Sequence, residues 1–503
     1  MAENYIKRIL EANVYDVAVE SPLSAAQFLS DRLNNTILIK REDEQPVYSF
    51  KCRGAYNCIS KKTEEELARG VVTASAGNHA QGVALSAQKL GIKATIVMPR
   101  TTPEIKVASV RARGAKAVLH GDTFDEAFAY SQKLVEEKGM TYIHPYDDPD
   151  VIAGQGTIAM EMLRQHTGDI HAIFVPVGGG GIAAGVAAYV KYLRPEIKVI
   201  AVESTESACL AAAMKAGRRV TLPHVGIFAD GVAVAQIGKH TWQVCKDHID
   251  EVITVTPDEL CAAIKDIFDD TRSVAEPAGA LGVAGLKKYV EREGVEGKTL
   301  IAIESGANMN FDRLRYVSEM AEVGEGREVI MAVTIPERPG SFQTFCNVLG
   351  KRPITEFNYR YGKDDAAQIY VGVKVPEGGK LDLLNELADN AYPVIDLSDD
   401  EISKYHIRHM VGGHAPESVD NEILYRFEFP ERPGALLLFL KKLGKRWNIS
   451  MFHYRNHGAA SGRVLVGLQV PTKEKKELNK YLDEVGYPYW EESDNPAYKL
   501  FLG

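Results

Sequence analysis

The chain has 503 residues, of which 45% are hydrophobic and 25% charged, and its formal net charge is −9. This length allows about three domains, and the composition is that of a globular protein with a buried core. The acidic balance argues against nucleic acid or an anionic membrane as the main partner. No apolar run approaches the roughly 18 residues of a membrane span, and the first residues lack the apolar core of a signal peptide.

The cysteines are sparse for so long a chain and form no C-x-x-C pair, so we expect reduced thiols in a cytoplasmic protein. They are Cys52, Cys58, Cys209, Cys245, Cys261 and Cys346.

The first 320 residues alternate short apolar runs with segments of helical periodicity. The runs predicted to be strands are residues 70–74, 93–99, 172–177 and 198–204, and the segments predicted to be helices are 78–91, 104–114 and 181–193. Residues 299–310 predict a further strand that ends in a turn. This rhythm is typical of βαβ units and predicts parallel sheets covered by helices.

A lysine in an apolar setting is the first candidate for chemistry. Lys51 stands in the stretch S-F-K-C-R-G-A at a predicted helix start. Such a lysine loses its proton more easily and can form a Schiff base with a carbonyl compound. For an arbitrary lysine the simpler interpretation is a solvated side chain.

A turn of small residues, T-A-S-A-G-N-H-A-Q-G at residues 73–82, follows the first predicted strand of this set. Ser75, Asn78 and the nearby N–H groups can bind a carboxylate or a ring oxygen. An ordinary helix cap explains the same residues equally well. Ser305, in the stretch E-S-G-A-N-M-N, offers one neutral hydroxyl at a strand end, and a simple turn serine is its alternative interpretation.

Four consecutive glycines, Gly178 to Gly181, lie between a predicted strand and a predicted helix that Ile182 opens. Because glycine has no Cβ, successive N–H groups can converge on an anion, and the helix dipole adds positive potential. A phosphate cup is one interpretation. The stretch also fits the dinucleotide fingerprint G-x-G-x-x-A, with Glu203 at the next strand end available for a ribose hydroxyl. These glycines alone leave both ligands open.

The pattern changes near residue 320, where a charged, glycine-containing stretch predicts a linker. Beyond it, residues 334–361 resemble residues 428–456. Pro336 and Pro430 lie 94 residues apart, and the spacing becomes 95 by Tyr359 and Tyr454, which indicates one inserted residue near Asn448 or Ile449. Each copy predicts the order strand, helix, strand, strand, helix, strand, a ferredoxin-like βαββαβ unit with a P-E-R-P-G turn after its first strand.

The motifs S-F-K-x-R-G-A, S-A-G-N-H-A-Q-G, G-G-G-G-I and S-G-A-N, taken together and in this order, resemble the serine/threonine dehydratase family of fold-type II pyridoxal-phosphate enzymes. The resemblance runs from about residue 15 to 315. The paired repeat resembles ACT-like regulatory domains, as in the biosynthetic threonine dehydratase branch. The resemblance implies an α/β, tryptophan synthase β-like catalytic part of two parallel-sheet subdomains and two ferredoxin-like ACT-type domains. The expected limits are 1–320 for the catalytic domain, 321–328 for the linker, and 329–402 and 423–496 for the repeats.

The resemblance also assigns roles. Lys51 would carry pyridoxal phosphate and act as catalytic base, Asn78 would bind the phenolic oxygen, and Ser305 would face the pyridine nitrogen. The phosphate would be held by the N–H groups of Gly178, Gly179, Gly180, Gly181 and Ile182. Ser75, His79 and Gln81 lie on the loop that meets the substrate carboxylate in this family.

The implied activity is the dehydration and deamination of L-threonine to 2-oxobutanoate and ammonia, the first step of isoleucine synthesis. Isoleucine would inhibit through the repeats, valine would oppose it, and the assembly would be a homotetramer. L-Serine dehydration is the alternative activity within the same family. Two further alternatives from other classes are an NAD-dependent oxidoreductase and a non-catalytic amino-acid sensor. Some relatives bind a metal near the strand that ends at Glu203, but Cys209 stands where they have aspartate, so no metal is expected.

Overall fold

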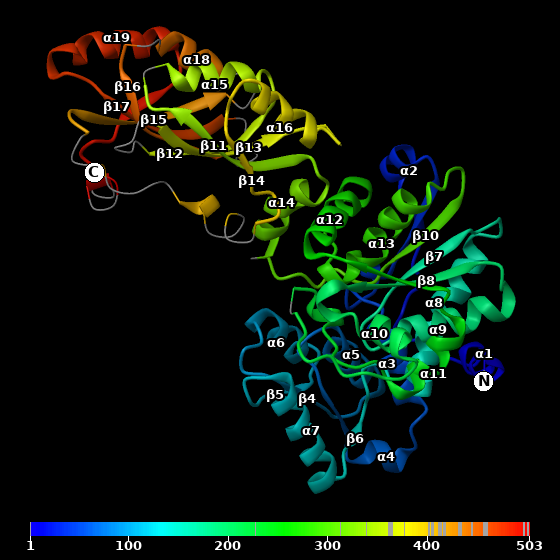
Figure 1. Cartoon of the computed structure of the whole chain (residues 1–503). Helices are drawn as coiled ribbons and strands as arrows, with labels where there is room; N and C mark the ends of the chain where they lie inside the picture. Colours follow the sequence, from blue (N-terminus) through cyan, green and yellow to red (C-terminus); the bar gives the residue numbers. More distant parts are fainter. Residues whose placement is uncertain are drawn as a thin grey trace. The chain divides into compact units, whose positions relative to one another are not determined.

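The structure is a computed structural model that describes most of the chain. The residues outside the described part are 1, 227, 312, 339, 361–365, 377, 401–402, 404–406, 411–414, 416–418, 431–434, 444–445, 456–460, 496–497, 500–501 and 503. The chain divides into two compact units, Met1–Ala321 and Glu322–Gly503, whose elements are labelled in Figure 1. Within the described residues, no helix combines the length and apolar character that a bilayer crossing requires.

The first unit contains two sheets. The larger has the order β1 (Leu23–Ala25), β2 (Thr36–Arg41), β10 (Thr299–Glu304), β7 (Ala172–Pro176), β8 (Lys198–Ser204) and β9 (Glu251–Val255). All neighbours are parallel except β1, which pairs antiparallel with β2 at the edge. The smaller is all parallel, with the order β5 (Lys116–Leu119), β4 (Ala94–Met98), β3 (Val71–Ala74) and β6 (Thr141–Tyr142). The predicted parallel α/β architecture is thus confirmed.

Helices connect these strands, as parallel pairing requires. They are α1 (Ala2–Leu10), α2 (Gln27–Leu33), α3 (Lys51–Ser60), α4 (Glu64–Ala68), α5 (Asn78–Leu90), α6 (Glu104–Arg111), α7 (Phe124–Lys138), α8 (Pro149–Gln165), α9 (Gly181–Leu193), α10 (Cys209–Ala216), α11 (Lys239–His248), α12 (Pro257–Thr271), α13 (Pro277–Glu293) and α14 (Arg313–Gly324). Short 3₁₀ helices are η1 (Glu42–Glu44), η2 (Thr205–Ser207) and η3 (Asp230–Val232). In the larger sheet α13 packs against β7 and β10 (Figure 1). The predicted elements are all present, with slightly different ends.

Helix α14 occupies the beginning of the stretch that the sequence predicts to be a linker. Val317, Met320 and Ala321 are buried, so the apolar face of this helix is anchored in spite of the charges around it. The helix continues to Gly324, and β11 begins at Glu328.

The second unit is built on one eight-stranded antiparallel sheet. The strands are β11 (Glu328–Pro336), β12 (Ile354–Arg360), β13 (Ala366–Lys374), β14 (Val394–Asp396), β15 (Glu422–Pro430), β16 (Asn448–Arg455), β17 (Ser461–Gln469) and β18 (Tyr489–Glu491). Their order is β14-β11-β13-β12-β16-β17-β15-β18. The helices are α15 (Ser341–Leu349), α16 (Lys380–Asp389), α18 (Ala435–Leu443) and α19 (Lys475–Val485), with η4 (Ile407–His409) and η5 (Thr472–Glu474). Each repeat therefore has the predicted βαββαβ order.

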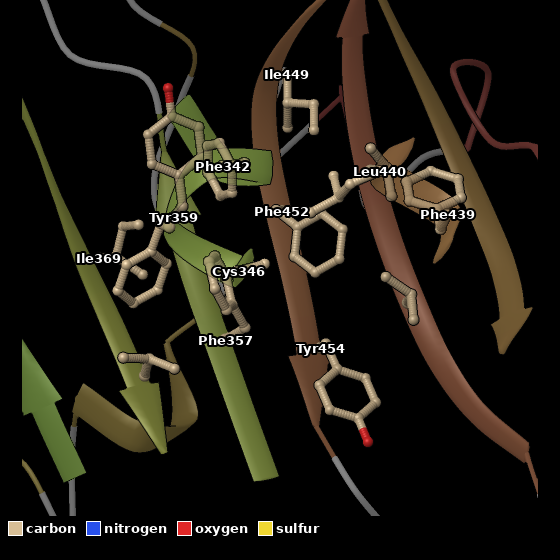
Figure 2. Close-up of a cluster of buried hydrophobic side chains, with 14 of the residues drawn as sticks. Phe342, Cys346, Phe357, Tyr359, Ile369, Phe439, Leu440, Ile449, Phe452 and Tyr454 are labelled. Atoms are coloured by element: carbon tan, nitrogen blue, oxygen red, sulfur yellow. The ribbon is translucent and has the colours of Figure 1, made fainter. Parts of the chain in front are cut away.

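The two repeats join through their second strands, because β12 pairs antiparallel with β16. Phe357 on β12 and Phe452 on β16 meet edge to face across this seam, with ring centroids 5.4 Å apart (Figure 2). Both belong to one hydrophobic cluster that includes residues of either repeat. The inserted residue of the second repeat falls where β16 begins: Trp447 and Asn448, the first residue of the strand, stand in place of the single Pro353.

A buried carboxylate opens the first strand of each repeat. Glu328 accepts hydrogen bonds from Thr355 and Arg408, and Glu422 accepts one from Ser450. Arg360 adds a further hydrogen bond to Glu422 at 2.8 Å. The repeats thus share a polar position as well as their apolar pattern.

Candidate active site

Lys51 is the first residue of α3, and its ammonium group lies inside the first unit. Its Nζ donates to the carbonyl oxygen of Pro145 at 3.1 Å and lies 5.2 Å from the centroid of the Phe50 ring. Burial lowers the pKa of Lys51 to about 8, and the nearby carboxylate of Glu276 opposes this shift. A neutral amine is therefore accessible near physiological pH.

The loop after β6 links Lys51 to the glycine turn. Pro145 accepts the Lys51 hydrogen bond, and the next residue, Tyr146, packs over the glycines. A Cβ built on Gly179 would lie 2.3 Å from the Tyr146 ring, and one on Gly181 would lie 3.1 Å from the Tyr146 Cβ. Sequence reasoning missed this loop, whose only signal is a stretch rich in proline and aspartate after a two-residue strand.

The glycine turn has the backbone that its sequence predicts. Gly180 has φ +90° and is the N-cap of α9, which begins at Gly181. A Cβ on Gly178 would lie 2.9 Å from the Cα of Val232, so larger residues do not fit there either. The N–H groups of residues 178–183 donate no hydrogen bond to any group in the described part of the chain. Such a row of free donors at a helix start is a ready binding place for an anion.

The turn after β3 and the start of α5 carry three predicted site residues, Ser75, His79 and Gln81. The Ser75 hydroxyl oxygen accepts from the N–H groups of Gly77 and Ala80, both at 3.3 Å. His79 Nε2 lies 3.0 Å from the carbonyl oxygen of Ile143, which can only accept, so Nε2 carries the proton. Burial, with the Lys51 charge second, lowers the pKa of His79 to about 3, and its Nδ1 has no hydrogen-bond partner in the described chain. Gln81 is also buried.

Asn78 is the first residue of α5, and both the nitrogen and the oxygen of its side-chain amide are hydrogen-bonded. Its Nδ2 donates to Oε1 of Glu276, and its Oδ1 accepts from Nδ2 of Asn308 at 2.7 Å. Neither Glu276 nor Asn308 was singled out from the sequence, although Asn308 belongs to the S-G-A-N motif. Glu276 precedes Pro277 at a helix start and therefore looks like an ordinary cap.

Ser305 lies directly after β10 and contacts the residue before Lys51. Its backbone carbonyl accepts from the N–H of Phe50 at 3.3 Å, and its hydroxyl donates to the carbonyl of Ala278 at 3.3 Å. The neighbouring Ser49 pairs with Gly306, and its buried hydroxyl has no hydrogen-bond partner in the described chain. Strand β10 and helix α3 therefore meet at the predicted site.

Glu203, the candidate ribose or metal ligand, caps α10. Its two carboxylate oxygens accept from the N–H groups of Leu210 at 2.7 Å and Ala211 at 2.8 Å. The Cys209 thiol lies 3.4 Å from the carbonyl oxygen of Gly178. Among the described residues no group of three or more His, Cys, Asp or Glu side chains is arranged to hold a metal. The absence of a required metal stays a prediction.

Comparison with known proteins identifies the class. Residues 15–306 match the family described as pyridoxal-phosphate dependent enzyme, and residues 319–407 and 413–502 match the C-terminal regulatory domain of threonine dehydratase. The first unit is therefore that of a pyridoxal-phosphate-dependent enzyme, and the repeats are regulatory domains.

The relatives narrow the class further. The biosynthetic L-threonine dehydratase of Burkholderia multivorans is 57% identical, covering 100% of this chain and 99% of that protein. The enzyme of Escherichia coli is 53% identical, covering 99% and 97%. A solved structure of threonine deaminase isoform 2 from Solanum lycopersicum is similar at 51% identity, with a TM-score of 0.63 over 64% of this chain and 93% of that chain. The chain belongs to the biosynthetic threonine dehydratase family.

The residues present fit pyridoxal phosphate. The glycine turn offers free N–H groups in a cradle that any Cβ would fill, and Lys51 offers an amine with a lowered pKa. The dinucleotide interpretation loses its ribose ligand, because both oxygens of Glu203 are used by α10. The family match and the local structure therefore agree on the cofactor.

Proposed function

We propose that this chain converts L-threonine to 2-oxobutanoate and ammonia by a pyridoxal-phosphate-dependent elimination, with Lys51 as the attachment point of the cofactor. The observation that carries the proposal is the loop of Pro145 and Tyr146, which contacts Lys51 on one side and Gly179 on the other. The carbonyl-reactive amine and the anion-binding turn are thereby held by one short segment. The names of the full-length relatives support the reaction.

Each cofactor-binding residue has a chemical role in this proposal. The N–H groups of Gly178 to Gly181 and of Ile182 bind the phosphate. Asn78 would donate to the phenolic oxygen. The Ser305 hydroxyl, which here donates to the carbonyl of Ala278, would face the pyridine nitrogen. A neutral hydroxyl does not stabilise a protonated ring as a carboxylate would, which favours departure of a β-hydroxyl over transamination.

Pyridoxal phosphate, when bound, supplies an electron sink for the pair left on the substrate α-carbon. Lys51, whose pKa is lowered to about 8, accepts the α-proton as general base. The β-hydroxyl would depart with a proton as water, which balances the α-proton taken up by Lys51, and the product would be the enamine of 2-oxobutanoate. A second water would hydrolyse this enamine to 2-oxobutanoate and ammonia.

The start of α5 binds the substrate carboxylate. The hydroxyl proton of Ser75 is available because its oxygen only accepts from the backbone. Gln81 adds an amide from the same helix. His79 is the second residue of α5. Its Nδ1 can only accept a hydrogen bond, because Nε2 carries the ring proton. It therefore orients a donor group and not the carboxylate itself.

The test is the release of 2-oxobutanoate from L-threonine by the purified protein and by Lys51→Ala. We expect Lys51→Ala to lose activity and borohydride to fix the cofactor on wild type alone. Lys133→Ala, an exposed lysine that pairs only with Glu137, is the matched control. An active Lys51→Ala enzyme would refute the assignment. Parallel assays with L-serine decide the substrate preference, since serine dehydration is the alternative activity.

We further propose that isoleucine inhibits and valine opposes it through the second unit. A pocket at the seam between the repeats is lined by residues 335–338, 340–343, 440, 443 and 447–449. Its lining includes the guanidinium of Arg338, the carboxylate of Glu337 and apolar side chains. Glu337 Oε1 accepts from the Tyr359 hydroxyl at 2.6 Å. The cavity has a volume of about 20 Å³, so we expect its walls to move apart when the carboxylate of an aliphatic amino acid meets Arg338. Pro339 and residues 431–434, the rest of the two predicted turns, lie outside the described residues.

Arg338→Ala tests this site. We expect the isoleucine concentration for half-inhibition to rise at least tenfold, the effect of about 1.4 kcal/mol, with unchanged activity when isoleucine is absent. Arg352→Ala, whose partner is Glu386 in the same repeat, is the control and should keep wild-type inhibition. Equal inhibition of Arg338→Ala and wild type would place the effector elsewhere.

The predicted limits 1–320, 321–328, 329–402 and 423–496 are proposed as the domain organisation; residues 1, 401–402 and 496 lie outside the described part. A homotetramer and a cytoplasmic location are likewise proposals from the resemblance. Sedimentation analysis of the purified protein, with and without isoleucine, measures the assembly.

A further inference from the structure

Glu276 occupies the N-cap position of α13 but does not cap it. An acidic residue there ordinarily accepts from the first N–H groups of its helix, whereas the Glu276 side chain makes no such bond. It is 4% exposed, and Pro277 follows as the first helical residue. The carboxylate is therefore turned away from its own helix, and its position needs another explanation.

The Glu276 carboxylate points to Asn78 instead. Asn78 Nδ2 donates to it, while Asn78 Oδ1 accepts from Asn308, whose Nδ2 also donates to the carbonyl of Val47 at 2.8 Å. If the Asn78 amide turned over, its oxygen would face the carboxylate and its NH₂ group would face the donor of Asn308. Glu276 and Asn308 together therefore permit only one orientation of this amide.

Glu276 also lies near the start of α3. A Cβ built on Gly306 would be 3.0 Å from Glu276 Oε1 and 3.0 Å from the Cβ of Ser49, two residues before Lys51. The charge of Glu276 opposes the lowering of the Lys51 pKa by burial.

Charges of both signs act on Glu276. The negative charge is that of Asp230 on η3, and the positive charges are those of Lys106 on α6 and Arg313 on α14. Lys106 pairs with Asp230 at 2.7 Å, and Arg313 lies 3.5 Å from it. The described residues show these cations paired with Asp230 and no ion pair of Glu276 itself.

We propose that Glu276 is a positioning residue for this enzyme: it sets the orientation of the Asn78 amide and provides the counter-charge for a cation at Lys51. The inference rests on the proposed function, because it assumes that Asn78 and Lys51 meet the cofactor. One N–H of Asn78 is then used by Glu276, and the second remains for the phenolic oxygen.

The pH dependence follows from the local charges. Burial, with Asp230 second, raises the pKa of Glu276 to about 7. The counter-charge is therefore present above about pH 7 and is lost as the pH falls through that value. Above it, Glu276 favours a proton on the nitrogen of Lys51.

The experiment follows the visible absorption of the holoenzyme as a function of pH in wild type, Glu276→Gln and Glu276→Asp. Loss of the charge in Glu276→Gln should move the titration midpoint of the lysine-bound cofactor down by about 1–3 pH units. Glu276→Asp keeps the charge and should keep the midpoint within a few tenths. Glu203→Gln is the control, because Glu203 is equally buried but serves α10, and its midpoint should equal that of wild type.

A second readout is the affinity of the apoenzyme for pyridoxal phosphate. Glu276→Ala, which removes both the acceptor and the charge, should bind the cofactor at least tenfold more weakly than Glu203→Gln. A wild-type midpoint in Glu276→Gln, or wild-type affinity in Glu276→Ala, would overturn the inference. Failure of the proposed function looks different: Lys51→Ala would then keep the absorption band that borohydride fixes. If Glu276→Gln fails to fold, the aspartate variant and the affinity measurement decide.

Discussion

The two units of this chain use β-structure in different ways. In the first unit nearly all strands are parallel, and the site residues Ser75 and Ser305 come directly after β3 and β10. In the second unit all strands are antiparallel, and the repeats meet side by side at β12 and β16. Parallel strands with helical crossovers collect their carboxyl ends at one edge, whereas paired antiparallel repeats create a seam.

The difference shows where each unit can bind a ligand. The first unit leaves the N–H groups of the glycine turn without a hydrogen-bond partner among the described residues, which is costly without a ligand. It also buries the amine of Lys51, which donates to the carbonyl of Pro145. The second unit fills its seam with aromatic rings and leaves a pocket beside them. Changes at strand ends should therefore affect catalysis, and changes at the seam should affect regulation.

The largest effect is expected from Gly179→Ala. The new Cβ would lie 2.3 Å from the Tyr146 ring, so either the ring or the turn must move. A displacement of about 1 Å in a catalytic arrangement costs about 100-fold in rate, and cofactor affinity should fall as well. Activity and cofactor titration measure both. Gly294→Ala is the control: its added methyl group meets no neighbouring atom, and its strain comes only from the φ of +60°. It should lose some stability but remain active.

Phe452→Ala tests the seam. This ring is fully buried and contacts Phe357 of the other repeat, so its loss should destabilise the second unit by about 3–5 kcal/mol. Denaturant unfolding and calorimetry should both show the lower stability of the second unit. Inhibition by isoleucine should weaken, while the activity without effector should persist. Phe311→Ala removes a ring that is 80% exposed and should change neither. Loss of basal activity in Phe452→Ala with intact inhibition would contradict the division of roles.

The reactivity of Lys51 in the apoenzyme tests whether the first unit activates its buried amine. Its pKa of about 8 means that labelling by an amine reagent should rise with pH to a midpoint near 8. A lysine in an unstructured model peptide, with its pKa of about 10.4, is the reference. Mass spectrometry of the labelled peptides gives the midpoint of Lys51. A Lys51 midpoint equal to that of the model peptide would show that burial does not activate this amine.

The smallest effect is expected from Thr256→Ala. Thr256 and Glu259 form a capping box at the start of α12. Its loss should cost about 1 kcal/mol of stability. Thermal unfolding measures this, and both the activity and the response to isoleucine should be those of wild type. A change in the response would show that α12 takes part in regulation.

Local patterns were sufficient for most elements and for the residues of the four motifs. The alternation that predicts β3, α5, β7 and α9 is a property of neighbouring residues, so the chain order reveals it without any long-range contact. The repeat likewise predicted two βαββαβ units. The pairing of β12 with β16 was not predictable, because it joins segments about a hundred residues apart and either repeat could have used another edge.

The sequence by itself determined the cofactor chemistry, because four motifs in one order resemble the pyridoxal-phosphate enzymes. Lys51 and the glycines of 178–181, taken separately, left other interpretations open. Only the tertiary structure decided the partners of those residues: that Tyr146 covers the glycines, that Glu203 serves a helix, and that Glu276 reaches Asn78. The reason is physical. A residue type limits which bonds a side chain can make, but its burial and its neighbours come from segments that meet only when the chain folds.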